Sequence, residues 1–130
     1  MLSQIMRKTL KSIPAGTSIT DAATKMREEK IGALLVEQKG TFIGLLTDTD
    51  IVRRGVGTKK NLDQTKVEQL MGTDLPSIQI SRTSHEAYDK MGDLGVRHLV
   101  ICDNDKIVGL VSMRDLLAHF RSYEPNMGID

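Results

Sequence analysis

The chain has 130 residues, enough for one compact domain or two very small ones, and its 18 basic residues nearly balance its 17 acidic ones. The formal net charge of +1 argues against nucleic acid or an anionic membrane surface as the main partner. The single cysteine, Cys102, excludes an internal disulfide, and no apolar stretch is long enough for a signal peptide or a membrane span, so a reducing, cytoplasmic location is expected.

The first half of the chain predicts a strand, a helix, two further strands and a second helix. A short strand over 10–13 is followed by the turn PAGT. Ser18 is placed to cap a helix with apolar residues at helical spacing, with Asp21 three residues later in the manner of a capping box. The segments ALLVE and TFIGLL read as strands joined by a hairpin at Lys39-Gly40, and DTDIVRR begins the last helix.

The second half repeats this order of elements. Thr83 and Glu86 form a capping box at the start of its first helix, and Gly95 ends that helix. HLVIC and KIVGLV are strands joined through DNDK. Because the strands of both halves are apolar on consecutive residues, we expect both faces of each sheet to be covered.

An internal repeat organises the chain. Shifting the sequence by 65 residues, from Gly44 to Gly109, aligns the two halves without a gap. Identical residues fall at Met6/Met71, Leu10/Leu75, Ser12/Ser77, Ile13/Ile78, Ala22/Ala87, Lys25/Lys90, Met26/Met91, Leu34/Leu99, Gly44/Gly109, Leu45/Leu110 and Asp50/Asp115. Since one half is too small to bury such a sheet alone, the copies are expected to pack on each other about a pseudo-twofold axis.

The repeat sets the expected domain boundaries. Repeat one covers 1–57 and repeat two covers 67–122. The polar segment 58–66 between them is expected to be a linker, the overlapping stretch GVGTKK over 55–60 is expected to be flexible, and 123–130 is a polar tail.

One phrase closes both copies: GLLTDTDIV over 44–52 and GLVSMRDLL over 109–117. Each places a hydroxyl residue three positions before an aspartate, as Thr47 with Asp50 and Ser112 with Asp115. This spacing is typical of a helix N-terminus, where the hydroxyl accepts a hydrogen bond from a free helix N–H and the acid lies at the positive end of the dipole.

The same spacing also suits a nucleotide. A helix N-terminus attracts phosphate, the hydroxyl can donate to a phosphate oxygen, and the aspartate can accept from the two ribose hydroxyls. Gly44 and Gly109 are then expected to keep the preceding strand uncluttered. Capping and binding are not mutually exclusive, and both interpretations stay open at this point.

The chain resembles a tandem CBS-domain pair, a family named for cystathionine β-synthase. The resemblance extends from about Met6 to Phe120. It rests on the doubled strand-helix-strand-strand-helix unit, the openings IMRKTL and LMGTDL, the strands IGALLV and VRHLVI, and the two closing phrases. It implies an α/β (α+β) fold of two β-α-β-β-α repeats with pseudo-twofold symmetry, clefts for adenosine-containing ligands between the repeats, and a disc-like homodimer.

The family's motif carries over to particular residues here. One cleft would combine the acid of the second repeat with the walls of the first, as Lys11, Ile31, Gly32, Ala33, Ser112, Arg114 and Asp115. The other would combine Thr47, Asp50, Pro76, Val96, Arg97 and His98. Small Gly32 and Ala33 leave room for a flat base, whereas Arg97 and His98 are large enough to reach phosphates.

The two clefts are not expected to be equivalent. The basic residue that commonly precedes the acid in this family is present as Arg114 but is replaced by Thr49 in the first repeat. The Asp115 cleft is therefore expected to be the better nucleotide site.

The expected function is that of a regulatory sensor of an adenine nucleotide of the AMP, ADP or ATP class, which acts on an unidentified effector protein in trans. No nucleophile is paired with a base and no metal-ligand spacing is present, so neither an enzyme nor a metal site is expected, and no cofactor is required. The alternatives are a ligand-free structural or dimerisation scaffold, and a module that binds S-adenosylmethionine or NAD(H).

Overall fold

The structure is a computed structural model that describes residues 1–123, so the tail predicted over 123–130 lies outside the described residues except for Tyr123. The chain folds into two compact units. The β1–β3 unit comprises Lys11–Leu75. The β4–β6 unit comprises Met1–Leu10 together with the chain from Pro76 onward.

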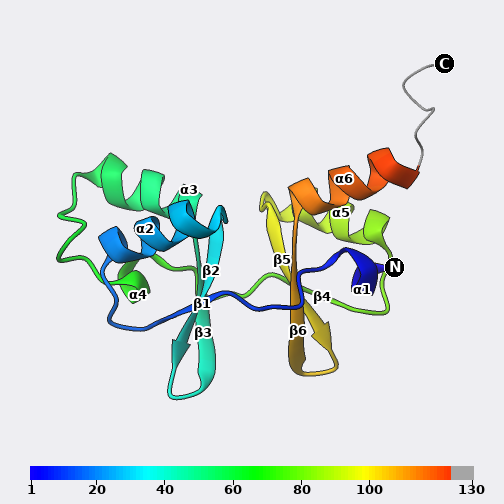
Figure 1. Cartoon of the computed structure of the whole chain (residues 1–130), viewed down its shortest axis with the longest axis horizontal. Coiled ribbons are helices and arrows are strands. Elements are labelled where there is room, and N and C mark those ends of the chain that lie inside the picture. The colour runs from blue at the N-terminus through cyan, green and yellow to red at the C-terminus, as the bar shows by residue number, and fades with distance from the viewer. Residues whose placement is uncertain (124–130) are drawn as a thin grey trace. The chain divides into compact units, whose positions relative to one another are not determined.

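The β1–β3 unit holds a three-stranded sheet covered on one face by helices (Figure 1). In chain order its elements are β1 (Ser12–Pro14), α2 (Ile19–Glu29), β2 (Ala33–Gln38), β3 (Thr41–Thr47), α3 (Asp48–Asp50), the π-helical turn η1 (Ile51–Gly55), the 3₁₀ turn η2 (Val56–Thr58) and α4 (Val67–Leu70). The central strand β2 pairs with β1 in parallel and with β3 in antiparallel orientation.

The β4–β6 unit has the same topology. Its elements are α1 (Leu2–Ile5), β4 (Ser77–Gln79), α5 (Ser84–Leu94), β5 (His98–Asp103), β6 (Lys106–Ser112) and α6 (Met113–Tyr123). Here β5 is central, parallel to β4 and antiparallel to β6. The expected mixed α and β class with a doubled three-stranded unit is therefore confirmed.

Local sequence signals explain where several elements begin and end. The Ser18 hydroxyl accepts a hydrogen bond from the Asp21 N–H at 3.1 Å, and the Thr83 hydroxyl accepts from the Glu86 N–H at 3.1 Å. The Glu86 carboxylate accepts the Thr83 N–H in return, which lowers the pKa of Glu86 below its ordinary value. Gly95 ends α5 with a φ of 68°, a conformation that glycine adopts without strain.

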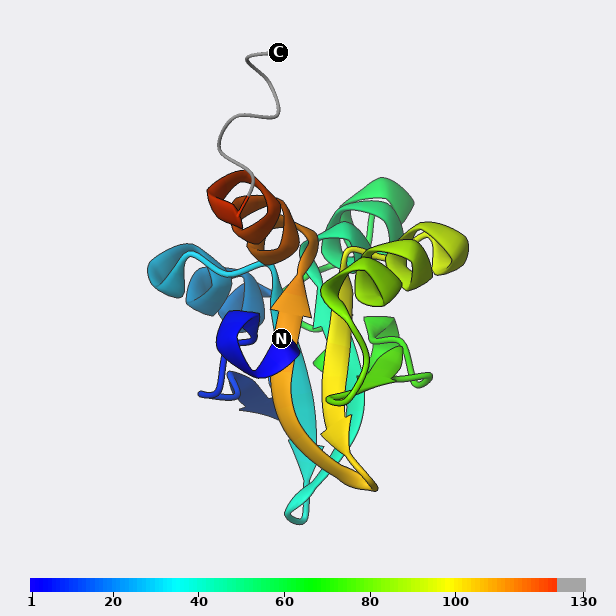
Figure 2. The same ribbon diagram turned by 90° about the vertical axis from the view of Figure 1, so that its right-hand side faces the viewer.

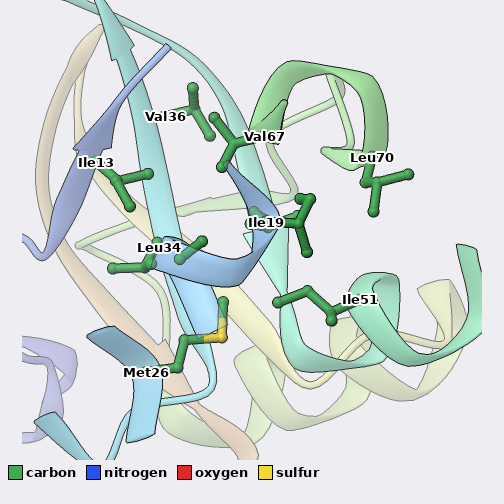
Figure 3. Close-up of a cluster of buried hydrophobic side chains, with 10 residues drawn as sticks. Ile13, Ile19, Met26, Leu34, Val36, Ile51, Val67 and Leu70 are labelled. Atoms are coloured by element: carbon green, nitrogen blue, oxygen red, sulfur yellow. The ribbon is translucent and has the colours of Figure 1, made fainter. Parts of the chain in front are cut away.

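The boundaries of the two compact units differ from those of the two sequence repeats. Each unit includes a short segment that belongs to the other repeat, and we call these the exchanged segments. Leu2 of α1 is fully buried in the core beneath β5 and β6, and Figure 2 draws α1 in blue in front of the β4–β6 unit. Val67 and Leu70 of α4 belong instead to the core beneath β2 and β3 (Figure 3). Each unit is therefore completed by a short helix that the sequence repeat assigns to the other one.

A glycine in each sheet makes room for the exchanged segment. Arg7 and Leu110 exchange backbone hydrogen bonds of 2.8 and 3.1 Å, and Gly72 and Leu45 exchange two of 2.9 Å. A Cβ at Gly109 would lie 3.2 Å from the Arg7 carbonyl oxygen and against Met6. A Cβ at Gly44 would lie 2.8 Å from the Gly72 carbonyl oxygen and against Met71. The glycines expected to keep the strands uncluttered thus admit a packed segment.

Both faces of the β1–β3 sheet are covered, as expected. The consecutive residues Ala33 to Val36 are all buried. Leu34 and Val36 belong to the core under α2, while Leu35 on the opposite face is also fully buried.

The linker segment 58–66 is hydrogen-bonded to the start of α2. The Ile19 N–H donates to the Thr65 carbonyl at 2.9 Å, and the Thr20 N–H donates to the Leu62 carbonyl at 3.2 Å. Thr65 is buried, and Leu62 packs against the core of the β1–β3 unit. The segment satisfies the free N–H groups at the start of α2, which fixes its path.

The exchange of segments predicts that α4 stabilises the β1–β3 unit. Leu70→Ala should lower the free energy of unfolding by about 2–4 kcal/mol, because it leaves a cavity in a close-packed core. Leu94→Ala removes the same atoms from a side chain that is 52% exposed and should change stability by about 0.5 kcal/mol or less. Urea unfolding measures both variants, and equal stabilities would contradict the assignment of α4 to this core.

Candidate functional site

Both repeated phrases lie where a strand runs directly into a helix. In the β1–β3 unit, the Thr47 hydroxyl accepts the Asp50 N–H at 3.2 Å and the Asp50 Oδ2 accepts the Thr47 N–H at 3.0 Å. In the β4–β6 unit, the Ser112 hydroxyl accepts the Asp115 N–H at 3.1 Å and the Asp115 Oδ2 accepts the Ser112 N–H at 3.0 Å. The capping interpretation is therefore confirmed for both phrases.

These caps leave specific atoms for a ligand. Each hydroxyl accepts a hydrogen bond, so its own proton stays available for donation to an anion. The contacts described for the Asp50 and Asp115 carboxylates within residues 1–123 all involve Oδ2. The second oxygen, Oδ1, can accept from a hydroxyl pair. Because all four side chains are only partly buried, these atoms lie within reach of solvent.

The helices that follow the two caps differ. α6 is regular over 11 residues, whereas the helix that follows Thr47 changes to the π-helical turn η1 after its first three residues. A Cβ at Gly55 would lie 3.1 Å from both Leu62 and Leu70, so the returning segment packs closely against this turn. The position that matches Gly55 in the repeat is Phe120, and α6 continues past it.

The predicted wall residues lie beside the cap of their own unit. Ala33 is paired with Thr47 in the sheet register, and His98 is paired with Ser112. The Asp48 N–H donates to the Gly32 carbonyl at 2.9 Å, and the Met113 N–H donates to the Arg97 carbonyl at 2.8 Å.

The absence of a side chain at Gly32 has a steric explanation within the β1–β3 unit itself. A Cβ at Gly32 would lie 3.0 Å from the Asp48 Oδ2. The glycine therefore allows the close approach of Asp48 at the start of α3. Its suitability for a flat base stays a prediction.

Lys11 and Pro76 occupy matched positions next to the central strands. The Leu35 N–H donates to the Lys11 carbonyl at 3.0 Å, and the Val100 N–H donates to the Pro76 carbonyl at 2.8 Å. The Lys11 ammonium lies 2.8 Å from the Glu29 Oε1 and lowers the pKa of Glu29 below its ordinary value. A ligand that uses Lys11 therefore competes with Glu29.

All predicted site residues fall into two half-sites, one in each unit. The Asp50 half-site contains Lys11, Ile31, Gly32, Ala33, Thr47 and Asp50. The Asp115 half-site contains Pro76, Val96, Arg97, His98, Ser112, Arg114 and Asp115. The predicted pairing of one unit's acid with the other unit's walls stays a prediction.

The sequence analysis missed Arg7. Its Nε lies 3.8 Å from the Asp115 Oδ2, and the two side chains are 47% and 17% exposed. The repeat assigned Arg7 to the first copy, more than a hundred residues from Asp115 in the sequence, so no local pattern connected them. Only the exchange of the segment Met1–Leu10 brings the cation to this half-site.

Two further searches of the described residues bear on other kinds of site. Within residues 1–123, no group of three His, Cys, Asp or Glu side chains is arranged to hold a metal ion. No helix in the same part of the chain is long and apolar enough to cross a membrane.

Comparison with protein families finds the CBS domain model matched twice, over residues 2–57 and 67–122. This chain belongs to the CBS-domain family. A protein of Methanopyrus kandleri, MK0525, is 33% identical over 113 residues. The match covers 85% of this chain and 57% of that relative, so the chain spans little more than half of the relative's length.

Solved structures share the CBS-pair architecture. A conserved protein from Pyrococcus horikoshii superimposes with a TM-score of 0.87 at 30% identity, covering 92% of this chain and 91% of the other. The CBS domain protein PAE2072 from Pyrobaculum aerophilum, solved in complex with AMP, superimposes with a TM-score of 0.77 at 21% identity, covering 92% and 97%. The second likeness establishes a shared fold.

The chain is thus a tandem CBS module. Modules of this kind commonly bind ligands and regulate other proteins, and they are generally not catalytic. The ligand and the partner are matters for proposal.

The cap at α6 predicts a measurable loss of stability. Ser112→Ala should lower the free energy of unfolding by about 1 kcal/mol, because the Asp115 N–H loses its acceptor. Ser112→Thr keeps a hydroxyl and should restore most of that stability. Thermal unfolding of both variants measures the effect, and equal melting temperatures for Ser112→Ala and the wild type would contradict a capping role.

Proposed function

We propose that the chain is a regulatory sensor that binds an adenine nucleotide of the AMP, ADP or ATP class and reports its occupancy to a partner protein. One observation carries the proposal: both caps present a hydroxyl proton and a carboxylate Oδ1 at the N-terminal end of a helix. The complex of PAE2072 with AMP, in a protein of the same fold, supports it.

The proposed binding mode uses the groups that the caps leave available. The Ser112 hydroxyl and free N–H groups at the start of α6 face phosphate oxygens. The Asp115 Oδ1 accepts from the two vicinal ribose hydroxyls, which requires no proton transfer. Thr47 and Asp50 offer the same groups in the other unit. The wall residues Ile31 to Ala33 and Val96 to His98 would flank the base.

The Asp115 half-site is proposed as the stronger of the two. It has a regular helix and carries Arg114 where the Asp50 half-site has Thr49. A cation beside a phosphate contributes a charge-assisted hydrogen bond, which is stronger than a neutral one.

Two alternatives make different claims about the same residues. In a ligand-free scaffold, the hydroxyl and acid serve only as caps, so their loss changes stability alone. A module for S-adenosylmethionine or NAD(H) would use the same acids on ribose but would prefer a different ligand. A panel of ligands separates the three.

The test is thermal unfolding with AMP, ADP, ATP, S-adenosylmethionine, NAD and NADH, with GTP as the base control. A ligand at about 100 times its dissociation constant should add about 2.7 kcal/mol to the stability of the protein. We expect a selective response to AMP, ADP or ATP. Asp115→Ala should weaken binding by about 1.5–3 kcal/mol, because a charge-assisted contact to ribose is lost, and Asp50→Ala should have a smaller effect.

The chain offers a matched control in Asp21. Ser18 and Asp21 have the same spacing at the start of α2, and the Ser18 hydroxyl accepts the Asp21 N–H. Asp21→Ala therefore removes an acid from a capped helix end that is not part of either half-site. It should leave ligand affinity unchanged. A flat ligand panel on protein free of bound nucleotide would favour the scaffold.

We further propose that the protein is a homodimer. Val52 and Leu117 occupy matched positions on the helical segments after the two caps, and they are 60% and 47% exposed. Two exposed apolar side chains at equivalent positions favour burial against a second copy of the chain. Closed homodimers are mostly twofold, so each of these positions would meet the same chain's second copy through an equivalent contact.

A charge introduced at Val52 or Leu117 tests the dimer. Val52→Glu and Leu117→Glu should each shift the mass in size-exclusion chromatography with light scattering from two chains to one. Leu94→Glu places the same charge at a side chain on α5 that is 52% exposed, and it should leave the mass unchanged. A wild-type mass of one chain would refute the homodimer.

A further inference from the structure

The two half-sites differ in charge at positions that the repeat matches one to one. The segment exchanged into the β4–β6 unit reads MRKTL, and its counterpart in the β1–β3 unit reads MGTDL. Arg7 therefore corresponds to Gly72, Lys8 to Thr73, and Thr9 to Asp74. The segment in the β4–β6 unit therefore carries two cations, whereas its counterpart in the β1–β3 unit carries none and has an acid.

The residues inside the two phrases add to this difference. The Asp115 half-site has Met113 and Arg114 where the Asp50 half-site has Asp48 and Thr49. The acid and hydroxyl are common to both. At these matched positions the Asp115 half-site carries cations or uncharged residues, whereas the Asp50 half-site carries acids or uncharged residues.

Arg7 is the cation that the structure places at the acid itself. Its backbone is fixed on β6 by the two hydrogen bonds with Leu110, two strand positions before Ser112. Its Nε lies 3.8 Å from the Asp115 Oδ2, the oxygen that also accepts the Ser112 N–H. Both contacts fall on one oxygen, so the guanidinium and a ribose bound at Oδ1 can occupy the site together.

The geometry points to Arg7 as the residue that makes the Asp115 half-site select a phosphorylated ligand over the same nucleoside without phosphate. This inference rests on the proposed nucleotide-binding function and specifies the ligand class of that site. A half-exposed guanidinium has donors left over after its contact with Asp115, and planar guanidinium groups match phosphate oxygens. The same charge disfavours S-adenosylmethionine, whose sulfonium is positive.

The test compares AMP with adenosine, which differ only in the phosphate. Isothermal titration of the full chain gives the ratio of the two affinities for the wild type, Arg7→Gln and Arg7→Lys. We expect Arg7→Gln to reduce the preference for AMP about fivefold to tenfold, with adenosine affinity unchanged. Arg7→Lys keeps the charge and should retain most of the preference.

Two controls assign the effect to this position. Lys8→Gln removes the same charge from the adjacent exposed residue and should change the ratio less than twofold. The loss caused by Arg7→Gln should persist in an Asp50→Ala background, which keeps the Asp115 half-site, and should disappear in an Asp115→Ala background. Circular dichroism and melting temperature confirm that each variant is folded.

The failures are distinguishable. If the wild type prefers AMP and Arg7→Gln retains that preference in full, the inference is overturned and the proposed function stands. If Arg7→Gln instead binds adenosine more tightly with AMP unchanged, Arg7 blocks the acid rather than selecting phosphate, and the inference is overturned. If the wild type binds none of AMP, ADP, ATP and adenosine, the proposed function fails and the inference fails with it.

Discussion

A glycine in the middle of β3 and of β6 is the constraint on which the rest of the structure depends. At Gly44 and Gly109 a side chain would collide with the carbonyl oxygen of an exchanged segment and with a methionine. The absence of a side chain lets that segment exchange backbone hydrogen bonds with the strand. The bonded segments then carry Leu2 and Leu70 into cores that would otherwise lack them. Without these two glycines, neither unit could close its core in this way.

The same contact also positions charge. Because Arg7 is the residue bonded to Leu110, its side chain is delivered to the N-terminal end of α6, beside Asp115. In the other unit the bonded residue is Gly72, which brings no side chain at all. Two units with one topology thus acquire different electrostatics, because the repeated segments carry different side chains at matched positions.

The repeated hydroxyl and acid serve the fold and leave groups for a ligand at the same time. The cap uses the lone pairs of the hydroxyl and one carboxylate oxygen, while the hydroxyl proton and the other oxygen are not consumed. A ligand that binds there adds to the hydrogen bonds of the helix end and does not replace them. This arrangement ties occupancy to the stability of the strand–helix junction, which is where a binding event can influence the packing of a unit.

Much of the fold was readable from short patterns whose causes are local. Ser18, Thr83 and Gly95 mark helix ends as predicted, because their hydrogen bonds and dihedral angles depend only on nearby residues. The turn at Lys39 and Gly40 was predicted for the same reason, and both residues have positive φ values. The repeat, the class of fold and both caps were also predicted from the sequence.

The linker and Arg7 are two features that short local sequence patterns did not predict. The segment 58–66 is polar and was predicted as a linker, and nothing in its sequence indicated that its carbonyls accept from the N–H groups of α2 far earlier in the chain. The sequence repeat assigned Arg7 to the first copy, whereas Asp115 belongs to the second. The sequence by itself determined the repeated elements, their caps and the residue types at each site. Only the tertiary structure decided which segment completes which core, and therefore which acid has a cation beside it, because those contacts join residues that no local pattern connects.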